Sequence, residues 1–316
     1  MIQPRAALLL ALLALPLLPS ADGWRSPSTA PAAAAFPGKN GRIVFVSNRV
    51  SSGHPSGDRE IYTMNAGGDD TQTLTQNSTN DYDPAWSPNG KRIVFVRNSL
   101  SGSGGLSGTS ISVMDADGSN LRHLIGSNQA FTDPAWAPSG KQIVFSFAQE
   151  IHIANADGSN LTNLTANQAN DASPVWSPDG KRIAFTSNRD GGFDLFTMRP
   201  DGGDPTKLTH TAGDDYYPSW APNGQQLAFT SGRSGSSQIY TMGADGSAPT
   251  NRTNSFGNHY DPAWSPDGTR TAFTSDRSGS ADIFAMWADG TSQAILSNTG
   301  GTDEEADWQP KKKRRR

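Results

Sequence analysis

Acidic and tyrosine side chains recur at fixed positions ahead of six tryptophans, and they are the residues best suited to chemistry or binding. The tryptophans are Trp86, Trp136, Trp176, Trp220, Trp264 and Trp308. Five residues before them stand Asp81, Phe131, Asp171, Asp215, His259 and Asp303. Three residues before them stand Asp83, Asp133, Ser173, Tyr217, Asp261 and Glu305, and the neighbouring tyrosines are Tyr82, Tyr216 and Tyr260. Carboxylates gathered in one place project a negative potential, which favours a cation or a basic partner.

Two other roles for these carboxylates stay open. Each aspartate could cap a turn or pair with an arginine of its own repeat, and the arginines available are Arg49, Arg189, Arg233 and Arg277. Paired acids at a suitable separation also carry out glycosidic chemistry. A carbohydrate lyase or hydrolase that uses the carboxylates and His259 is therefore the alternative to a binding site.

Other catalytic and metal sites find little support in the sequence. The chain has no cysteine, which excludes thiol nucleophiles, thiolate metal sites and disulfides. No Gly-x-Ser-x-Gly or His-x-x-x-His string occurs. Asp115–Asn120 resembles the start of a calcium loop, but Gly126 stands where such a loop needs a bidentate glutamate. We therefore expect no metal, no cofactor and no catalytic residues.

A repeat supplies the elements that must position the acidic residues. The steps between successive tryptophans are 50, 40, 44, 44 and 44 residues, a period typical of a propeller blade. In a representative copy, the tryptophan strand ends at a turn pair, Asp179-Gly180, and an apolar run follows at Ile183–Phe185. Polar and apolar residues then alternate over Leu195–Met198 before a second turn at Asp201-Gly202. Alternation with period two between turn pairs predicts four short strands in each copy.

The two ends of the repeat region are incomplete copies. The first, from Gly41 to Thr75, lacks a tryptophan strand, and the last, Asp303 to Pro310, is a tryptophan strand alone. We predict that the last strand completes the first blade. The fold is then all-β, a six-bladed propeller of four-stranded antiparallel blades, whose closed ring leaves no long open edge. Both acidic positions would surround one mouth of the axial channel. Residues 34–37 are the alternative source of the missing strand.

The segments outside the repeat indicate export. Arg5, the apolar run Ala6–Leu18 and the small residues that follow predict a signal peptide over residues 1–21, too short to span a membrane. Residues 22–35 form a Pro/Ala-rich linker, 36–310 the propeller and 311–316 a basic tail. We expect a periplasmic or secreted protein with no membrane span after cleavage. Because the net charge is −4 despite this tail, the body is acidic, and we expect it not to bind nucleic acid.

The segment Pro174–Phe185, Pro-Val-Trp-Ser-Pro-Asp-Gly-Lys-Arg-Ile-Ala-Phe, resembles the WD-like repeat of the TolB family. The resemblance covers about residues 36–310. It implies a six-bladed propeller and a binding or scaffold role in the cell envelope, as a monomer. The partner would be a protein, a peptide or another envelope ligand, including an envelope lipoprotein of a Tol-Pal system. TolB carries an α/β domain ahead of its propeller, whereas a signal and a linker are expected here, so the chain is TolB-like rather than TolB itself.

Overall fold

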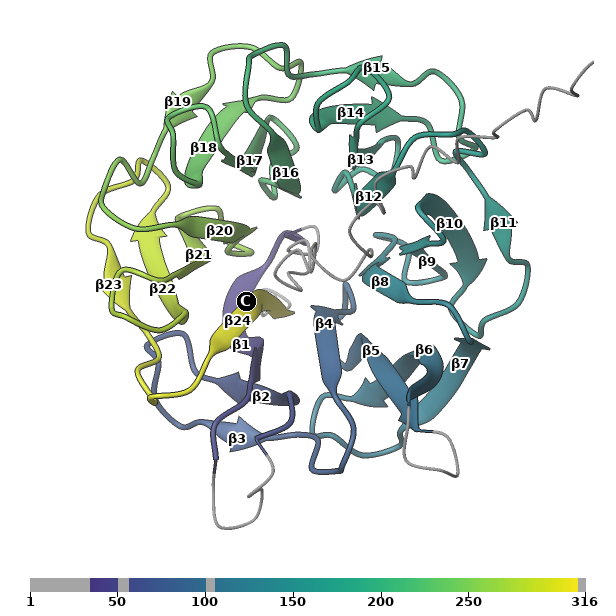
Figure 1. The fold of residues 1–316 in the computed structure, drawn as a ribbon. Helices are drawn as coiled ribbons and strands as arrows, with labels where there is room; N and C mark the ends of the chain where they lie inside the picture. The colour runs from purple at the N-terminus through teal and green to yellow at the C-terminus, as the bar shows by residue number, and fades with distance from the viewer. Residues whose placement is uncertain (1–34, 51–56, 101–105, 312–316) are drawn as a thin grey trace, which may run out of the picture.

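The computed structural model describes residues 35–50, 57–100 and 106–311, and these residues form a closed ring of six blades (Figure 1). Each blade is a four-stranded antiparallel sheet whose strands follow one another from the axis outwards. The prediction of an all-β, six-bladed propeller is confirmed.

Blades 1 to 3 contain the following strands, named from the axis outwards. Blade 1 consists of β24 (Asp303–Lys311), β1 (Lys39–Ser47), β2 (Glu60–Met64) and β3 (Gln72–Thr73). Blade 2 consists of β4 (Asp81–Trp86), β5 (Arg92–Leu100), β6 (Leu106–Asp115) and β7 (Arg122–Ser127). Blade 3 consists of β8 (Phe131–Trp136), β9 (Gln142–Phe147), β10 (Glu150–Asn155) and β11 (Thr162–Asn163).

Blades 4 to 6 repeat the same order. Blade 4 consists of β12 (Asp171–Trp176), β13 (Ile183–Ser187), β14 (Asp194–Met198) and β15 (Thr206–Lys207). Blade 5 consists of β16 (Asp215–Trp220), β17 (Gln226–Ser231), β18 (Gln238–Gly243) and β19 (Thr250–Asn251). Blade 6 consists of β20 (His259–Trp264), β21 (Arg270–Ser275), β22 (Asp282–Trp287) and β23 (Ala294–Ile295).

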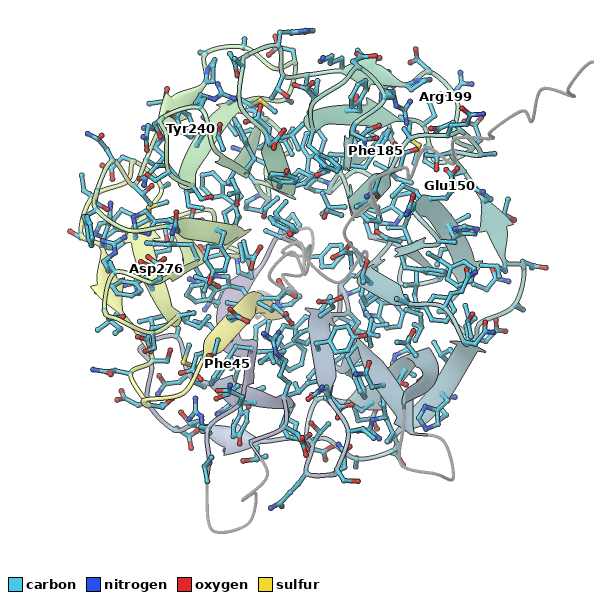
Figure 2. All side chains as sticks on the ribbon, in the orientation of Figure 1. Phe45, Glu150, Phe185, Arg199, Tyr240 and Asp276 are labelled. Atoms are coloured by element: carbon cyan, nitrogen blue, oxygen red, sulfur yellow. The ribbon has the colours of Figure 1, made fainter. Side chains whose placement is uncertain are left out.

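Large aromatic side chains fill the space between neighbouring blades. The tryptophans of the innermost strands are all buried. The second strand of every blade adds a fully buried phenylalanine, namely Phe45, Phe95, Phe145, Phe185, Phe229 and Phe273. Figure 2 shows two of these rings, Phe45 and Phe185, within blades far apart in the ring. Because side chains alternate across a strand, each sheet presents packing residues to both of its neighbours.

The C-terminal strand closes the ring. β24 pairs antiparallel with β1, and the register places Trp308 opposite Ile43 and Asp307 opposite Val44. The Asp307 carboxylate also accepts the backbone N–H of Trp86 in blade 2 at 2.7 Å. The last strand therefore completes blade 1 as predicted and ties it to blade 2.

Residues 34–37 do not supply the innermost strand, so that alternative is wrong. Ala35 and Phe36 are buried but lie outside any strand. Ala35 packs in a cluster with Trp264, and Gly38 donates its N–H to the carbonyl of Pro266 at 2.9 Å. This segment fastens the start of the propeller to blade 6, at the end of the inner strands where their tryptophans lie.

The predicted signal peptide, nearly all of the linker, and residues 312–316 of the basic tail lie outside the described residues. Within the described ranges, no helix has the length and apolar character needed to cross a membrane.

Candidate functional site

The carboxylates five residues before the tryptophans form ion pairs inside their own blades. Asp171 lies 3.0 Å from Arg189, and Asp215 lies 2.9 Å from Arg233. The same pairing joins Asp81 to Arg97 at 2.6 Å and Asp303 to Arg49 at 3.0 Å. All four carboxylates are fully buried, so the structure places Asp81, Asp171, Asp215 and Asp303 as braces inside the blades. Of these four, Asp171 alone also lines the cavity at the mouth that is described below.

The arginines of these pairs also stack on the aromatic core. The guanidinium carbon of Arg189 lies 5.1 Å from the ring centre of Phe185 and 4.8 Å from that of Phe196. A cation over a ring face is attracted by the ring quadrupole. Arg97 was missed in the sequence because it lies within β5, two residues after Phe95, whereas the other arginines follow their phenylalanine by four. Each of these four blades therefore contains an aspartate paired with an arginine that lies over aromatic rings, and we name this arrangement the aspartate–arginine–aromatic unit.

His259 takes the place of the aspartate in blade 6. Its Nδ1 lies 2.9 Å from the hydroxyl of Ser275 and its Nε2 lies 3.0 Å from that of Ser255. Burial, and then the nearby charge of Arg277, lower the pKa of His259 to about 4. The imidazole is therefore neutral at pH 7 and fully buried.

The contact between Ser255 and His259 has structural counterparts in other blades. In three other blades the side chain four positions before the brace aspartate donates a hydrogen bond to that aspartate. These pairs are Asn77–Asp81, Asn167–Asp171 and Thr299–Asp303. A serine next to a histidine could form a nucleophile–base pair. Here the repetition favours a bracing role for Ser255.

The residues three positions before the tryptophans adopt a left-handed backbone in every blade. Their φ angles lie between 54° and 63°, at Asp83, Asp133, Ser173, Tyr217, Asp261 and Glu305. In blade 2 the pairing of β4 with β5 shifts register between Tyr82 and Ala85, and the other blades shift at the same place. Such a bulge bends the strand and re-aims a side chain.

Three bulge carboxylates link successive blades around the axis. Glu305 accepts the N–H of Asp83 at 2.7 Å, and Asp83 accepts the N–H of Asp133 at 2.9 Å. Asp133 accepts the N–H of Ser173 at 3.2 Å. The fourth bulge carboxylate, Asp261, has no hydrogen-bond partner for either oxygen within the described part of the chain. The structure therefore brings Asp83, Asp133, Asp261 and Glu305 together.

Burial makes this carboxylate group less negative than its formal charge. Desolvation is the main cause that raises the pKa of Asp133 to about 6. Desolvation and the neighbouring carboxylates hold the pKa values of Asp83, Asp261 and Glu305 well above the usual range. Arg59 lies 3.3 Å from Glu305 and supplies positive charge.

Glu304 and Tyr260 lie on the side of the mouth that blades 1 and 6 form. Glu304 lies 2.9 Å from Arg59 and accepts a hydrogen bond from the Tyr260 hydroxyl at 3.3 Å. These contacts fill the region above blades 1 and 6. Tyr260 is therefore part of the mouth but does not line the cavity described next.

A cavity of about 1280 Å³ opens at the mouth above blades 2 to 5, and we name it the mouth cavity. Six predicted residues line it, namely Tyr82, Asp83, Asp133, Asp171, Tyr216 and Tyr217. Seven predicted residues do not, namely Asp81, Asp215, His259, Tyr260, Asp261, Asp303 and Glu305. Side chains that the sequence did not single out complete it, among them Asn98, Phe147, Gln149, Asn170 and Phe193.

A shortened turn in blade 3 opens this side of the mouth. β9 and β10 are joined by Ala148 and Gln149 alone, with φ angles of 53° and 66°. Phe131 and Phe147 stack 4.6 Å apart where four of the other blades place an aspartate–arginine brace. The sequence signal was the step of 40 residues from Trp136 to Trp176, the shortest of the five.

No group of three or more histidine, aspartate or glutamate side chains is arranged to hold a metal ion in residues 35–50, 57–100 and 106–311.

Two family models match parts of the chain. The N-terminal β-propeller domain of the Tricorn protease matches residues 128–251, and the TolB β-propeller domain matches residues 211–314. A comparison with curated proteins finds no match.

Solved structures share the fold at low sequence identity. TolB from Acinetobacter baumannii aligns with a TM-score of 0.73 and 20% identity, over 86% of this chain and 67% of that one. A putative TolB from Agrobacterium tumefaciens aligns with a TM-score of 0.65 and 22% identity, over 84% of this chain and 92% of that one. An oligogalacturonate lyase from Vibrio parahaemolyticus aligns with a TM-score of 0.53 and 12% identity, over 72% of this chain and 71% of that one. Together with the ring of six blades, these matches identify the chain as a TolB-like six-bladed β-propeller.

Proposed function

We propose that this chain is an exported, non-catalytic binding or scaffold propeller that holds a cell-envelope ligand in the mouth cavity. The ligand is a protein, a peptide or another envelope component, as expected from the sequence. The observation that carries the proposal is the mouth cavity, a concave site lined by half-buried aromatic rings and by side-chain amides. Concave sites with a few placed polar groups are the usual form of ligand pockets.

The state of the acidic and basic groups supports binding over catalysis. A general base needs a proton-accepting group near its substrate and a pKa close to the working pH. His259 is buried with a lowered pKa. Asp133 has a pKa of about 6, but Asp133 and Asp83 are both buried and accept backbone N–H groups of the next blade. The alternative, a carbohydrate lyase or hydrolase, would need carboxylates that reach a bound sugar. The predicted signal peptide at residues 1–21 supports export.

The test is capture of envelope material on the immobilised protein, followed by analysis of what is released. We expect the ligand to come off with its original size, and the variant Tyr216→Ala with Gln149→Ala to lose capture. The matched control is Phe256→Ala, because Phe256 is 90% exposed and does not line the mouth cavity. A ligand released in shortened form would overturn the non-catalytic role. Equal capture by the mouth variant would overturn the site.

A further inference from the structure

The charged groups that line the mouth cavity are already engaged by partners within the protein. Arg59 pairs with Glu304 at 2.9 Å, and Asp171 pairs with Arg189 at 3.0 Å. Asp214 accepts the N–H of Phe193 at 3.0 Å. A ligand that carried net charge would have to break these contacts or leave its own charge without a partner, and both cost free energy.

The carboxylates in the cavity wall are also satisfied or shielded. Asp133 accepts hydrogen bonds from Thr132, Ser146 and the backbone of Ser173. Asp83 is 2% exposed, so little of its surface reaches a ligand. The cavity is therefore a weaker site for a basic peptide than the sequence pattern indicated.

Uncharged amides are the polar groups left to meet a ligand. The side chains of Gln129, Gln149 and Asn170 line the cavity and make no hydrogen bond within the described part of the chain. Each carboxamide offers two N–H donors and a carbonyl acceptor side by side. Two further amides are held in place, since the side-chain oxygen of Asn98 accepts the Tyr82 hydroxyl at 2.9 Å and that of Asn188 accepts the backbone N–H of Asn170 at 2.7 Å.

Three aromatic rings follow one another on one wall of the cavity, with successive ring planes tilted by 40° and 34°, and we name them the platform. The ring centres of Phe193 and Tyr216 lie 5.1 Å apart, and those of Tyr216 and Tyr217 lie 5.8 Å apart. All three side chains are half-buried, so part of each ring remains accessible. Burial, and then the nearby Asp214 carboxylate, raise the pKa of Tyr216, so its hydroxyl stays protonated at neutral pH.

We propose that the ligand of the mouth cavity is an uncharged saccharide, whose ring faces lie on the platform Phe193–Tyr216–Tyr217 and whose hydroxyls bond to the amides of Gln129, Gln149 and Asn170. A sugar ring has apolar C–H faces and an edge of hydroxyl groups that both donate and accept. Aromatic rings with a polar tip suit such an amphipathic surface, and paired amide donors and acceptors suit neighbouring hydroxyls. This inference rests on the proposed function and names the ligand class.

The experiment compares three preparations of the envelope fraction as material for capture on the full chain. One is untreated, one is digested with a protease of broad specificity, and one is oxidised with periodate. Periodate cleaves the carbon–carbon bond between two neighbouring carbons that each carry a hydroxyl group. We expect capture of carbohydrate to survive the protease and to be lost after periodate. In addition, neutral oligosaccharides released from the same fraction are added as soluble competitors. Competition by them supports a saccharide and shows that short sugars suffice, whereas no competition at saturating concentration counts against a neutral saccharide in this cavity.

The variants test the two halves of the site separately. Phe193→Ala should weaken capture roughly tenfold, whereas Tyr216→Phe, which keeps the ring, should retain most of it. Gln149→Ala tests the amides, and Phe256→Ala is the control outside the cavity. Capture that is lost after protease and survives periodate, yet depends on Phe193, would overturn the saccharide and leave the proposed function standing. No capture by the wild-type protein, or capture independent of Phe193 and Gln149, would overturn both. Circular dichroism of each variant confirms that it is folded.

Discussion

The aspartate–arginine–aromatic unit explains why acidic residues recur ahead of the tryptophans. In four blades the buried carboxylate neutralises an arginine that also lies over core rings. In blade 6 the neutral His259 forms no ion pair with Arg277, which instead contacts Gln293 at 2.7 Å and, within the described residues, feels only the unpaired charge of the neighbouring Asp276 carboxylate. A partly buried cation without a countercharge costs free energy. Among the five blades that have an arginine at this place, blade 6 is therefore the one in which the unit stabilises the fold least.

A reciprocal exchange tests this interpretation. His259→Asp should raise the melting temperature by a few degrees at pH 7, because the new carboxylate pairs with Arg277 as Asp171 does with Arg189. Asp171→His should lower it, because Arg189 loses its countercharge. For a domain of this size about 1 kcal/mol corresponds to roughly 2–4 °C. Calorimetry of both variants is the measurement, and a lower melting temperature for His259→Asp would show that the imidazole is the better partner.

The strands show which features hold the ring closed and which shape the site. β24 closes blade 1, and its register with β1 runs from the pair Lys39–Lys311 to the pair Ser47–Asp303. The bulges in the innermost strands bring four carboxylates to the axis. The two-residue turn between β9 and β10 makes room for the mouth cavity.

Deletion of residues 303–316 should cost several kcal/mol of unfolding free energy, because blade 1 loses its innermost strand. The deletion removes the buried ring of Trp308 and the hydrogen bond that the Asp307 carboxylate accepts from Trp86 in blade 2. Deletion of residues 312–316 alone is the control and should leave the melting temperature unchanged. Thermal unfolding of the two truncated proteins checks the prediction. Equal melting temperatures for the longer deletion and the intact chain would mean that the ring does not depend on β24.

At the scale of the whole molecule, much of the architecture could be predicted from the sequence, whereas the site could be predicted only in part. Trp spacing and turn pairs are local signals, and the incomplete copies at the ends indicated how the ring closes. The sequence did not show that these acidic residues are buried, because the residue type alone does not distinguish an aspartate that pairs with an arginine inside a blade from one that faces the channel mouth. Phe193 and Gln149 belong to loops whose sequences do not follow the repeat. That both residues line one cavity could therefore be seen only in the three-dimensional structure.

The buried carboxylates predict a pH dependence of the whole fold. Burial raises the pKa of Asp307 from the usual 3.8 to about 7, and that of Asp133 to about 6. Between pH 4 and 7, roughly, the folded chain therefore binds more protons at these sites than the unfolded chain, and these groups add stability as the pH falls. The lowered pKa of His259, about 4, acts in the opposite direction below about pH 6.5, because the unfolded chain then binds the proton more readily. Because more carboxylates are raised than imidazoles are lowered, we expect the melting temperature to be a few degrees higher at pH 5 than at pH 7.

The matched variant for this prediction is Asp133→Asn with Asp307→Asn, in which neither side chain titrates. Its melting temperature should change less between pH 7 and pH 5 than that of the wild type. A wild-type protein that is more stable at pH 7 than at pH 5, with the same slope in the variant, would contradict the prediction.

The most direct test of the proposed binding site is photo-crosslinking from single positions in the source cells. A photoreactive phenylalanine analogue replaces Ala130, an exposed residue that lines the mouth cavity but has no part in the proposed contacts, or Asn223, an exposed residue in the turn that follows β16 at the opposite end of the inner strands. Binding in the mouth cavity predicts an adduct from position 130 that carries saccharide, and none from position 223. An adduct from position 223 with none from position 130 would contradict the proposed site.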